Sequence, residues 1–158
     1  MASTLVVRGP ASLSGRARPP PDKSVAHRAL LFAALADGES VVRPYVPGRD
    51  VEATAAALRR LGVRLETRFP GELAVVGAGR PRDWPGVADV VPIDCGNSGT
   101  TLRLLAGLLA GRPGRVRFDG DASLRRRPME RLRPLERMGA RFSGPAPLGA
   151  PFELEGTT

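Results

Sequence analysis

The order of apolar and polar positions repeats along the chain. In the first half, an apolar helical stretch at 27–38, "HRALLFAALADG", is followed by the strand-like "ESVVRPY", a helix ending in "ALRRLGVRLE" and the strand "ELAVVG". In the second half, "TLRLLAGLLAGR" at 101–112 is followed by "VRFDG", a helix ending in "LERMGARF" and then "PFELEG". The apolar helices are offset by 74 positions and the endings "LRRLG" and "LERMG" by 77. This pattern predicts a duplicated unit of helix, strand, helix, strand and strand, with an initial strand before each unit.

Local signals support the helices of both units. Asp50 is a favourable N-cap, and Gly62 and Gly139 fit positions just past helix ends, where positive φ is needed. Pro128 suits the first turn of the amphipathic helix in the second unit, whereas Pro134 should kink or shorten it. The apolar stripe of that helix holds Met129, Leu132, Leu135 and Met138. The first helix of each unit is apolar nearly all round, so we expect sheet and partner helices to enclose it.

The fold class that follows is α/β, built from repeats. The chain shows neither G-x-G-x-x-G after a strand nor G-x-x-x-x-G-K-[ST], which disfavours a doubly wound nucleotide-binding fold. Only 4% of residues are aromatic, so Leu, Val and Ala must fill the core. The longest apolar run, "ALLFAALA", is far shorter than the ~20 residues of a membrane span. We therefore expect a soluble cytoplasmic protein with no membrane partner, in which the single cysteine, Cys95, is structural.

The charge indicates anionic partners. The chain has a formal net charge of +8 and a pI of about 11.3. Nucleic acid is disfavoured because the cations are scattered, and the cluster Arg125–Arg127 has no interleaved aromatic residues for base stacking. Lys23 is the only lysine among 24 basic residues. This bias indicates a site that needs a compact ammonium group, although a single surface lysine would give the same pattern.

The stretch "DCGNSGTTLRLLAG", from Asp94 to Gly107, places small and turn-forming residues before an apolar helix. The first N–H groups of a helix have no partner within it, and the helix dipole makes that end partly positive. A glycine-rich entry lets a phosphate or carboxylate approach those N–H groups. The stretch therefore predicts an anion site.

Two further segments carry cations beside helix starts. In "PPPDKSVAHR" at 19–28, Asp22 or Ser24 can cap the helix, and Arg28 follows Ser24 by one turn. These groups could grip a phosphorylated small molecule, or they could be a capped helix with solvated cations. In "GDASLRRRPM" at 120–129, at least one arginine could reach the same anion, and a solvated basic loop is the alternative.

Groups for other chemistries are scarce. The one histidine, His27, lies on an apolar helix and is more simply a hydrogen-bonded structural residue than a catalyst. His and Cys show no metal-ligand spacing, and no carboxylate pair stands out as an acid and a base. We expect neither a metal nor an organic cofactor.

Three segments in this order, "PPDKSVAHRALLFAALADG", "DCGNSGTTLRLLAGLLAG" and "GDASLRRRPMERLRPLERMGA", closely resemble the N-terminal part of the 3-phosphoshikimate 1-carboxyvinyltransferases, or 5-enolpyruvylshikimate-3-phosphate synthases. The related UDP-N-acetylglucosamine enolpyruvyl transferases match less well. The resemblance implies an inside-out α/β barrel of βαβαββ units. It also implies transfer of the enolpyruvyl group of phosphoenolpyruvate to the 5-hydroxyl of shikimate 3-phosphate, with release of phosphate, in the shikimate pathway to aromatic amino acids, and without a cofactor.

The resemblance also assigns site residues. Lys23 would contact both substrates and act in catalysis, while Ser24 and Arg28 would bind shikimate 3-phosphate. The residues implied for phosphoenolpyruvate, besides Lys23, are Asn97, Gly99 and Arg127, with Thr100 and Arg103 as supports. Gly99 would allow close approach of substrate or of the herbicide glyphosate. Pro21 and Ala26 depart from the family, which usually has Gly and Ser or Thr there; proline fixes φ and removes an N–H.

The family is much longer than this chain and has two lobes, each of three βαβαββ units. By the resemblance, residues 1–20 form a strand and crossover that belong to the other lobe. Residues 21–158 form a partial substrate-binding lobe of two repeats, about 21–90 and 91–158. The missing lobe, with the proton-transferring residues, would be needed in cis or in trans, and we otherwise expect a monomer.

Two alternatives remain at this stage. The chain could be an inactive, truncated module that only binds substrate. It could also be a basic RNA-binding protein built on the same α/β unit, similar to the RNA 3′-phosphate cyclases.

Overall fold

The computed structural model describes residues 4–6, 9, 12, 14–81, 84 and 90–157. The first unit contains helix α1 (Lys23–Leu35), strand β1 (Asp37–Val42), helix α2 (Arg49–Arg60), strand β2 (Arg64–Phe69) and strand β3 (Glu72–Ala78). This order confirms the predicted helix, strand, helix, strand and strand. Its three strands form an antiparallel sheet in the order β1-β3-β2.

The second unit repeats this order with one strand added in front. It runs β4 (Val90–Asp94), α3 (Gly99–Leu109), β5 (Gly114–Asp119), α4 (Ala122–Arg125), the 3₁₀ helix η2 (Glu130–Met138), β6 (Arg141–Ser143) and β7 (Phe152–Gly156). The sheet order is β4-β5-β7-β6, with β4 parallel to β5 and the other pairs antiparallel. β4 is therefore the initial strand predicted for this unit.

The initial strand expected before α1 is not seen in the described residues of 1–22, none of which is in a strand. Part of the matching segment "VVR" (6–8) lies outside the described residues. The helices and strands that the structure describes in this half therefore begin with α1 at Lys23.

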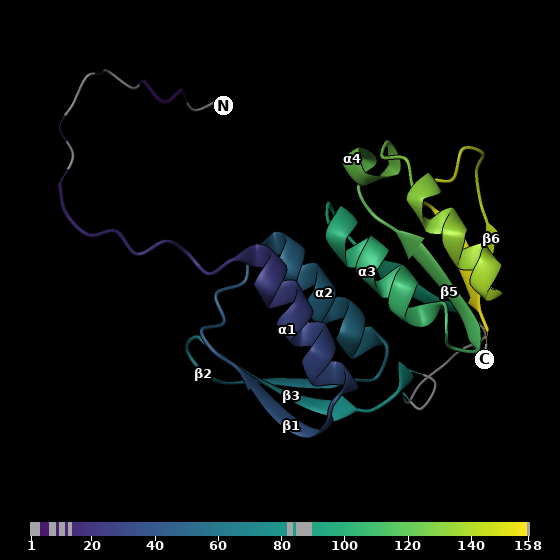
Figure 1. The fold of residues 1–158 in the computed structure, drawn as a ribbon, viewed down its shortest axis with the longest axis horizontal. Helices are drawn as coiled ribbons and strands as arrows, with labels where there is room; N and C mark the ends of the chain where they lie inside the picture. The colour runs from purple at the N-terminus through teal and green to yellow at the C-terminus, as the bar shows by residue number, and fades with distance from the viewer. Residues whose placement is uncertain are drawn as a thin grey trace.

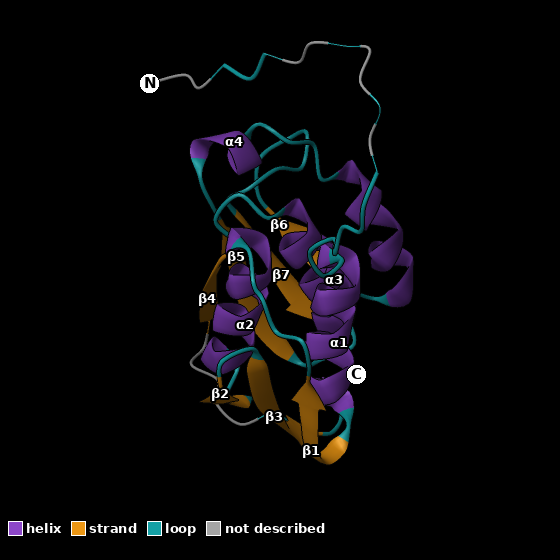
Figure 2. Cartoon of the chain, turned by 90° about the vertical axis from the view of Figure 1, so that its left-hand side faces the viewer, coloured by secondary structure: helices purple, strands orange, loops and turns teal. Residues whose placement is uncertain are grey.

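The sheets and helices form layers that share one apolar core. Figures 1 and 2 place the three-stranded sheet at the opposite end of the molecule from α4. The fully buried residues are mostly leucines from helices and strands, such as Leu30, Leu58, Leu73 and Leu105. Leu and Ala thus fill the core, as the low aromatic content predicts. In the second sheet the rings of Phe118 and Phe152 form a tilted pair with their centroids 5.5 Å apart.

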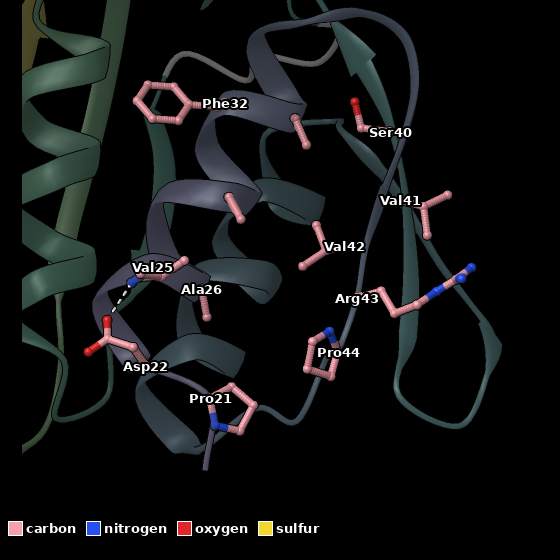
Figure 3. Close-up of a pocket in the computed structure, with 12 residues that line it drawn as sticks. Pro21, Asp22, Val25, Ala26, Phe32, Ser40, Val41, Val42, Arg43 and Pro44 are labelled. Atoms are coloured by element: carbon pink, nitrogen blue, oxygen red, sulfur yellow. Dashed lines mark hydrogen bonds between the residues drawn. The ribbon is translucent and has the colours of Figure 1, made fainter. Parts of the chain in front are cut away.

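One surface of α1 is exposed, so the expectation that sheet and helices enclose it is wrong. The side chains of Val25 and Phe32 are 55% and 67% exposed. Figure 3 shows the groove between this surface of α1 and strand β1, which Val25, Val41 and Val42 help to line. β1 lies at an edge of its sheet, and the groove is also lined by Pro21 and Pro44.

The helix punctuation is partly confirmed and partly corrected. Gly62 and Gly139 have φ of 89° and 97°, as predicted for residues after helix ends. Asp50 is not the N-cap of α2, because the cap is Gly48 and Asp50 lies in the first turn. Because Asp50 does not cap α2, its carboxylate can pair with another residue.

The helix that contains Pro134 is a 3₁₀ helix rather than an α-helix. Its apolar stripe repeats every three residues, which matches the three residues per turn of that geometry. Met129 and Leu132 are buried, but Met138 at the last turn is 71% exposed. Leu135 is partly buried against the core, so the stripe packs along most of its length and is exposed only at its last residue.

Candidate anion-binding site

The N-terminus of α1 is capped by Asp22, whose carboxylate accepts a hydrogen bond from Val25 N at 2.7 Å. The alternative cap, Ser24, is exposed and lies inside the helix. Arg28 is also exposed. Ser24 and Arg28 are therefore both open to a ligand.

Lys23 is held by Asp50, for which the sequence predicted only a helix cap. Lys23 Nζ donates to Asp50 Oδ2 at 2.7 Å, with the lysine side chain 57% exposed and the aspartate 28% exposed. The signal that could have found Asp50 was an acidic residue near a helix start, but it was interpreted as a cap. The pair directs the ammonium group towards the start of α2, and more than half of the lysine side chain stays exposed to solvent.

The N-terminus of α3 has the glycine-rich entry that the sequence indicated. Ser98 caps the helix by accepting from Thr101 N at 3.1 Å, and Gly99 is the first helical residue. Gly96 has φ of 54°, a left-handed conformation that glycine adopts at low cost, and its N–H donates to Asp94 Oδ1 at 2.8 Å. The turn thus places Asn97 and Gly99 at the N-terminus of α3.

The three consecutive arginines have different roles. Arg125 forms a two-point ion pair with Asp119, donating from Nε at 2.9 Å and from Nη2 at 2.7 Å. This hydrogen bonding is the main cause of a lowered pKa of the Asp119 carboxyl. Arg126 is exposed. Arg127 is half-buried and turns back towards the start of α3.

Arg127 is fixed by Asn97. Arg127 Nη2 donates to Asn97 Oδ1 at 2.6 Å, and Asn97 Nδ2 donates to Asp121 Oδ2 at 2.7 Å. The Asn97 bond is the largest cause of a lowered pKa of the Asp121 carboxyl, which also caps α4 by accepting from Leu124 N. An ionised Asp121 therefore orients the amide, and the amide orients the guanidinium.

Gly99 lies directly against this guanidinium. A Cβ atom added at Gly99 would lie 3.3 Å from Arg127 Nη1 and 3.9 Å from Arg103 Nη1. Arg103 Nη2 also donates to the carbonyl oxygen of Pro128 at 3.4 Å. Thr100, the residue after Gly99, is half-buried. The absence of a side chain at Gly99 keeps both guanidinium groups close to the helix mouth.

A buried hydroxyl links the two halves of the site. Thr101 Oγ1 donates to the backbone oxygen of Asp50 at 3.1 Å and lies 2.8 Å from Ser98 Oγ. It also lies 2.7 Å from Thr54 Oγ1, which in turn lies 2.7 Å from His27 Nδ1. The starts of α1, α2 and α3 therefore meet, and Figure 1 shows these three helices beginning on the same side of the molecule.

This arrangement places cations at the starts of helices that meet through Thr101. Lys23, Arg103 and Arg127 come from different elements, and each sits at or beside the first turns of a helix. Helix N-termini and guanidinium groups bind phosphate and carboxylate oxygens well. The site is suited to small ligands that carry more than one anionic group.

Other chemistry finds little support in the described residues. Burial, aided by the nearby Asp94 and Asp119 carboxylates, raises the pKa of the Cys95 thiol to about 12, so this thiol stays protonated at neutral pH. The described part of the chain contains no group of three or more His, Cys, Asp or Glu that could hold a metal ion. Within the same residues, no helix has the length and apolar character to cross a membrane.

The buried histidine makes stability depend on pH. Burial lowers the pKa of His27 below 6.5, an effect that nearby Lys23 reinforces and Asp50 opposes. The unfolded chain then binds more protons than the folded chain as pH falls below 6.5, so the free energy of unfolding decreases there. We expect thermal melts to show this loss between about pH 7 and pH 5, and His27→Gln to flatten it. The Asp119 and Asp121 carboxyls act in a separate window, below their ordinary pKa of 3.8. Equal slopes in the parent chain and the variant would contradict this assignment.

Known proteins share both this sequence and this fold. The family model of "EPSP synthase (3-phosphoshikimate 1-carboxyvinyltransferase)" matches residues 7–157. A 3-phosphoshikimate 1-carboxyvinyltransferase of Acidithiobacillus ferrooxidans is 49% identical over 90% of this chain, and one of Afipia carboxidovorans is 48% identical over 96%. These alignments cover 33% and 34% of the two relatives, so the chain spans about a third of their length.

The structural comparison gives the same result. The EPSP synthase of Acinetobacter baumannii superimposes with a TM-score of 0.77 and 37% identity, covering 87% of this chain and 31% of that protein. This agreement also confirms the predicted repeated α/β fold. On sequence and structure together, the chain belongs to the EPSP synthase (3-phosphoshikimate 1-carboxyvinyltransferase) family.

Proposed function

We propose that this chain forms one half of the site of an enzyme that transfers the enolpyruvyl group of phosphoenolpyruvate to the 5-hydroxyl of shikimate 3-phosphate and releases phosphate. The observation that carries the proposal is the meeting of the Lys23–Asp50 pair with the Arg127–Asn97 pair at the starts of α1, α2 and α3. Both substrates are anionic, so this is a site into which either could fit. Family membership gives the RNA-binding alternative no support.

Each proposed site residue has a role that its position supports. Lys23 contacts both substrates and neutralises phosphate charge as the reaction proceeds. Ser24 and Arg28, exposed on the first turns of α1, bind the phosphate of shikimate 3-phosphate. Asn97 and Arg127 hold phosphoenolpyruvate against Gly99, and the supports are Thr100 and Arg103.

The remainder of the reaction belongs to parts of the family that this chain does not span. We place the acid and base that move protons in the second lobe, supplied in cis or in trans. The half-site then binds and orients substrate but turns over slowly or not at all by itself. We further propose that the complete enzyme works in the cytoplasm as a monomer.

The direct test is a calorimetric or amide-NMR titration of the chain with shikimate 3-phosphate, beside Lys23→Ala. We expect saturable binding by the parent chain and at least a tenfold loss in the variant, because a charge-assisted contact to phosphate is removed. Binding that is unaffected by Lys23→Ala would overturn the assignment of Lys23. If a folded parent chain shows no binding, restoring Gly at position 21 and adding the second lobe will separate an effect of Pro21 from an incomplete site. Enzymatic phosphate release by the chain alone would refute the half-site proposal.

A second prediction concerns Gly99. Gly99→Ala places a methyl group 3.3 Å from Arg127 Nη1, so the guanidinium must move by a few tenths of an ångström. We expect phosphoenolpyruvate affinity, measured by NMR with shikimate 3-phosphate at saturation, to fall about three- to tenfold. Because the displaced atom is the end of a flexible side chain, stability should change little. Gly107→Ala, in open space on the same helix, is the matched control. An unchanged affinity would contradict the close approach assigned to Gly99.

A further inference from the structure

The described residues contain one continuous buried polar chain, and the proposed reaction does not use it directly. It runs from His27 through Thr54 to Thr101 and Ser98, and each of these side chains is at most 1% exposed. The surrounding core is apolar, with neighbours such as Leu30 and Leu58 in the same helices. Buried polar networks are costly unless their hydrogen bonds are satisfied, so this hydroxyl chain requires a reason.

The number of hydroxyl hydrogens fixes which groups donate and which accept in this network. Thr101 has one hydroxyl hydrogen and three oxygen neighbours, of which the backbone oxygen of Asp50 can only accept. Thr101 donates this hydrogen either to the Asp50 oxygen or to Ser98 Oγ, and in both cases Thr54 donates its own hydroxyl hydrogen to Thr101. The Thr54 hydrogen is then used, so at the 2.7 Å contact with His27 the ring must donate from Nδ1–H.

His27 is accordingly the first donor of the chain, in its neutral Nδ1–H form. Its other ring nitrogen, Nε2, is buried and has no hydrogen-bond partner, a setting that suits a bare lone pair better than a charged N–H group. The charged groups that act on the ring are Asp50 of α2 and Lys23 of α1, and burial outweighs the attraction of Asp50 in lowering the His27 pKa. Protonation of this ring would leave the Lys23–Asp50 and Arg127–Asn97 contacts in place. It would change the hydrogen-bond pattern that starts at His27.

Two members of the hydroxyl network contact the two halves of the site. Thr101 holds the backbone of Asp50, whose carboxylate binds Lys23. Ser98, the next member, lies between Asn97 and Gly99 in the sequence, and both of these residues lie against Arg127. A shift of Thr101 would therefore move the ammonium and guanidinium groups relative to each other.

We propose that His27, Thr54 and Thr101 are positioning residues, which fix the separation of Lys23 from Arg127 so that both can engage one pair of substrates. The inference rests on the proposed function for the identity of the ligands. Its geometric part, the coupling of Lys23 to the buried hydroxyls, does not depend on which ligands bind. It extends the site to side chains that no ligand touches.

The chain offers two natural probes for the geometric part, since it contains one lysine and one histidine. In untagged protein carrying ¹³Cε-lysine and ¹⁵N-histidine, each label reports a single residue: one ¹³Cε signal for Lys23 and two ring ¹⁵N signals, from Nδ1 and Nε2, for His27. We expect the ¹⁵N shifts of His27 to report the neutral Nδ1–H form at neutral pH. Thr54→Val should change them, because the acceptor for Nδ1–H is lost. A neutral Nε2–H form in the parent chain would overturn the direction assigned here.

The lysine signal tests the coupling. Asp50→Asn marks the position of the ¹³Cε signal of Lys23 when the ion pair is broken. We expect Thr101→Val to move the signal towards that position, and Thr101→Ser, which keeps the hydroxyl, to leave it in place. Thr67→Val, at an exposed threonine of β2, is the matched control. If Thr101→Val leaves the signal unchanged, the coupling is refuted, and if this variant does not fold, Thr54→Val gives the same comparison.

Binding separates this inference from the proposed function. We expect Thr101→Val to weaken shikimate 3-phosphate about tenfold and Thr101→Ser to stay within about threefold of the parent chain. If the parent protein binds no shikimate 3-phosphate but shows the expected lysine and histidine signals, the half-site is refuted. The coupling of Lys23 to the buried hydroxyls then still holds. Normal binding in Thr101→Val would refute the positioning role and leave the half-site intact.

Discussion

Gly77→Ala and Gly156→Ala should each destabilise this protein by about 3 kcal/mol or more, or prevent folding. A Cβ atom at Gly77, in β3, would lie 2.0 Å from the backbone oxygen of Ala36 and 2.6 Å from that of Ala33. These are backbone atoms at the end of α1, so no side-chain rotation relieves the contact. The helix would have to move away from the sheet, and much of the core of the first unit would open with it.

The second unit repeats this contact. A Cβ atom at Gly156, in β7, would lie 2.1 Å from the backbone oxygen of Arg112 and 2.4 Å from that of Leu109, at the end of α3. Both glycines hold the same register position, since Gly77 pairs with Gly38 of β1 and Gly156 with Gly114 of β5. Each apolar helix therefore ends against a glycine of its own sheet.

Urea unfolding followed by circular dichroism measures both effects. The midpoint should fall sharply with an unchanged m value, because the same surface is exposed on unfolding. Gly107→Ala is the matched control, since its Cβ meets nothing within 4 Å. Gly107 lies in the last turn of α3, so the change to alanine should raise stability by up to about 1 kcal/mol, because alanine favours helix more than glycine does. Loss of stability of the same size in the control would show that the close approach is not the cause.

Arg127→Gln should reduce the affinity for phosphoenolpyruvate about ten- to a hundredfold, whereas Arg126→Gln should change it less than about twofold. Arg127 is held by Asn97 Oδ1 at 2.6 Å and lies against Gly99, so it is already oriented towards the start of α3. Arg126 carries the same charge one residue away and is exposed. The comparison therefore separates an oriented guanidinium from the general positive charge of the loop.

The measurement is an amide-NMR titration with phosphoenolpyruvate while shikimate 3-phosphate is held at saturation. The half-site predicts that shifts in the segment from Asn97 to Gly99 are lost in Arg127→Gln and kept in Arg126→Gln. Equal weakening in both variants would indicate non-specific attraction by the basic loop instead. Because Arg127 is only half-buried, neither substitution should alter stability greatly.

The repeat, the order of the elements and the helix starts that bear cations could all be predicted from the sequence. These features are local: hydrophobic period, glycine after a helix and small polar residues before one are all set by neighbours along the chain. The same reasoning interpreted Asp50 as a cap, since an acidic residue near a helix start fits a cap and an ion pair equally well. It also expected α1 to be enclosed, although Val25 and Phe32 are exposed.

The tertiary structure alone decided which groups meet. It paired Lys23 with Asp50 across 27 positions and Arg127 with Asn97 across 30, and it separated Arg127 from two identical neighbours. The lone histidine is hydrogen-bonded, as predicted. Only the structure shows that it begins a buried hydrogen-bond network that links three helices. Contacts of this range depend on how sheets and helices pack, and periodicity along the chain carries no information about the packing distance. The glycines Gly77 and Gly156 show this most directly, because only the helix packed against each one makes a side chain there impossible.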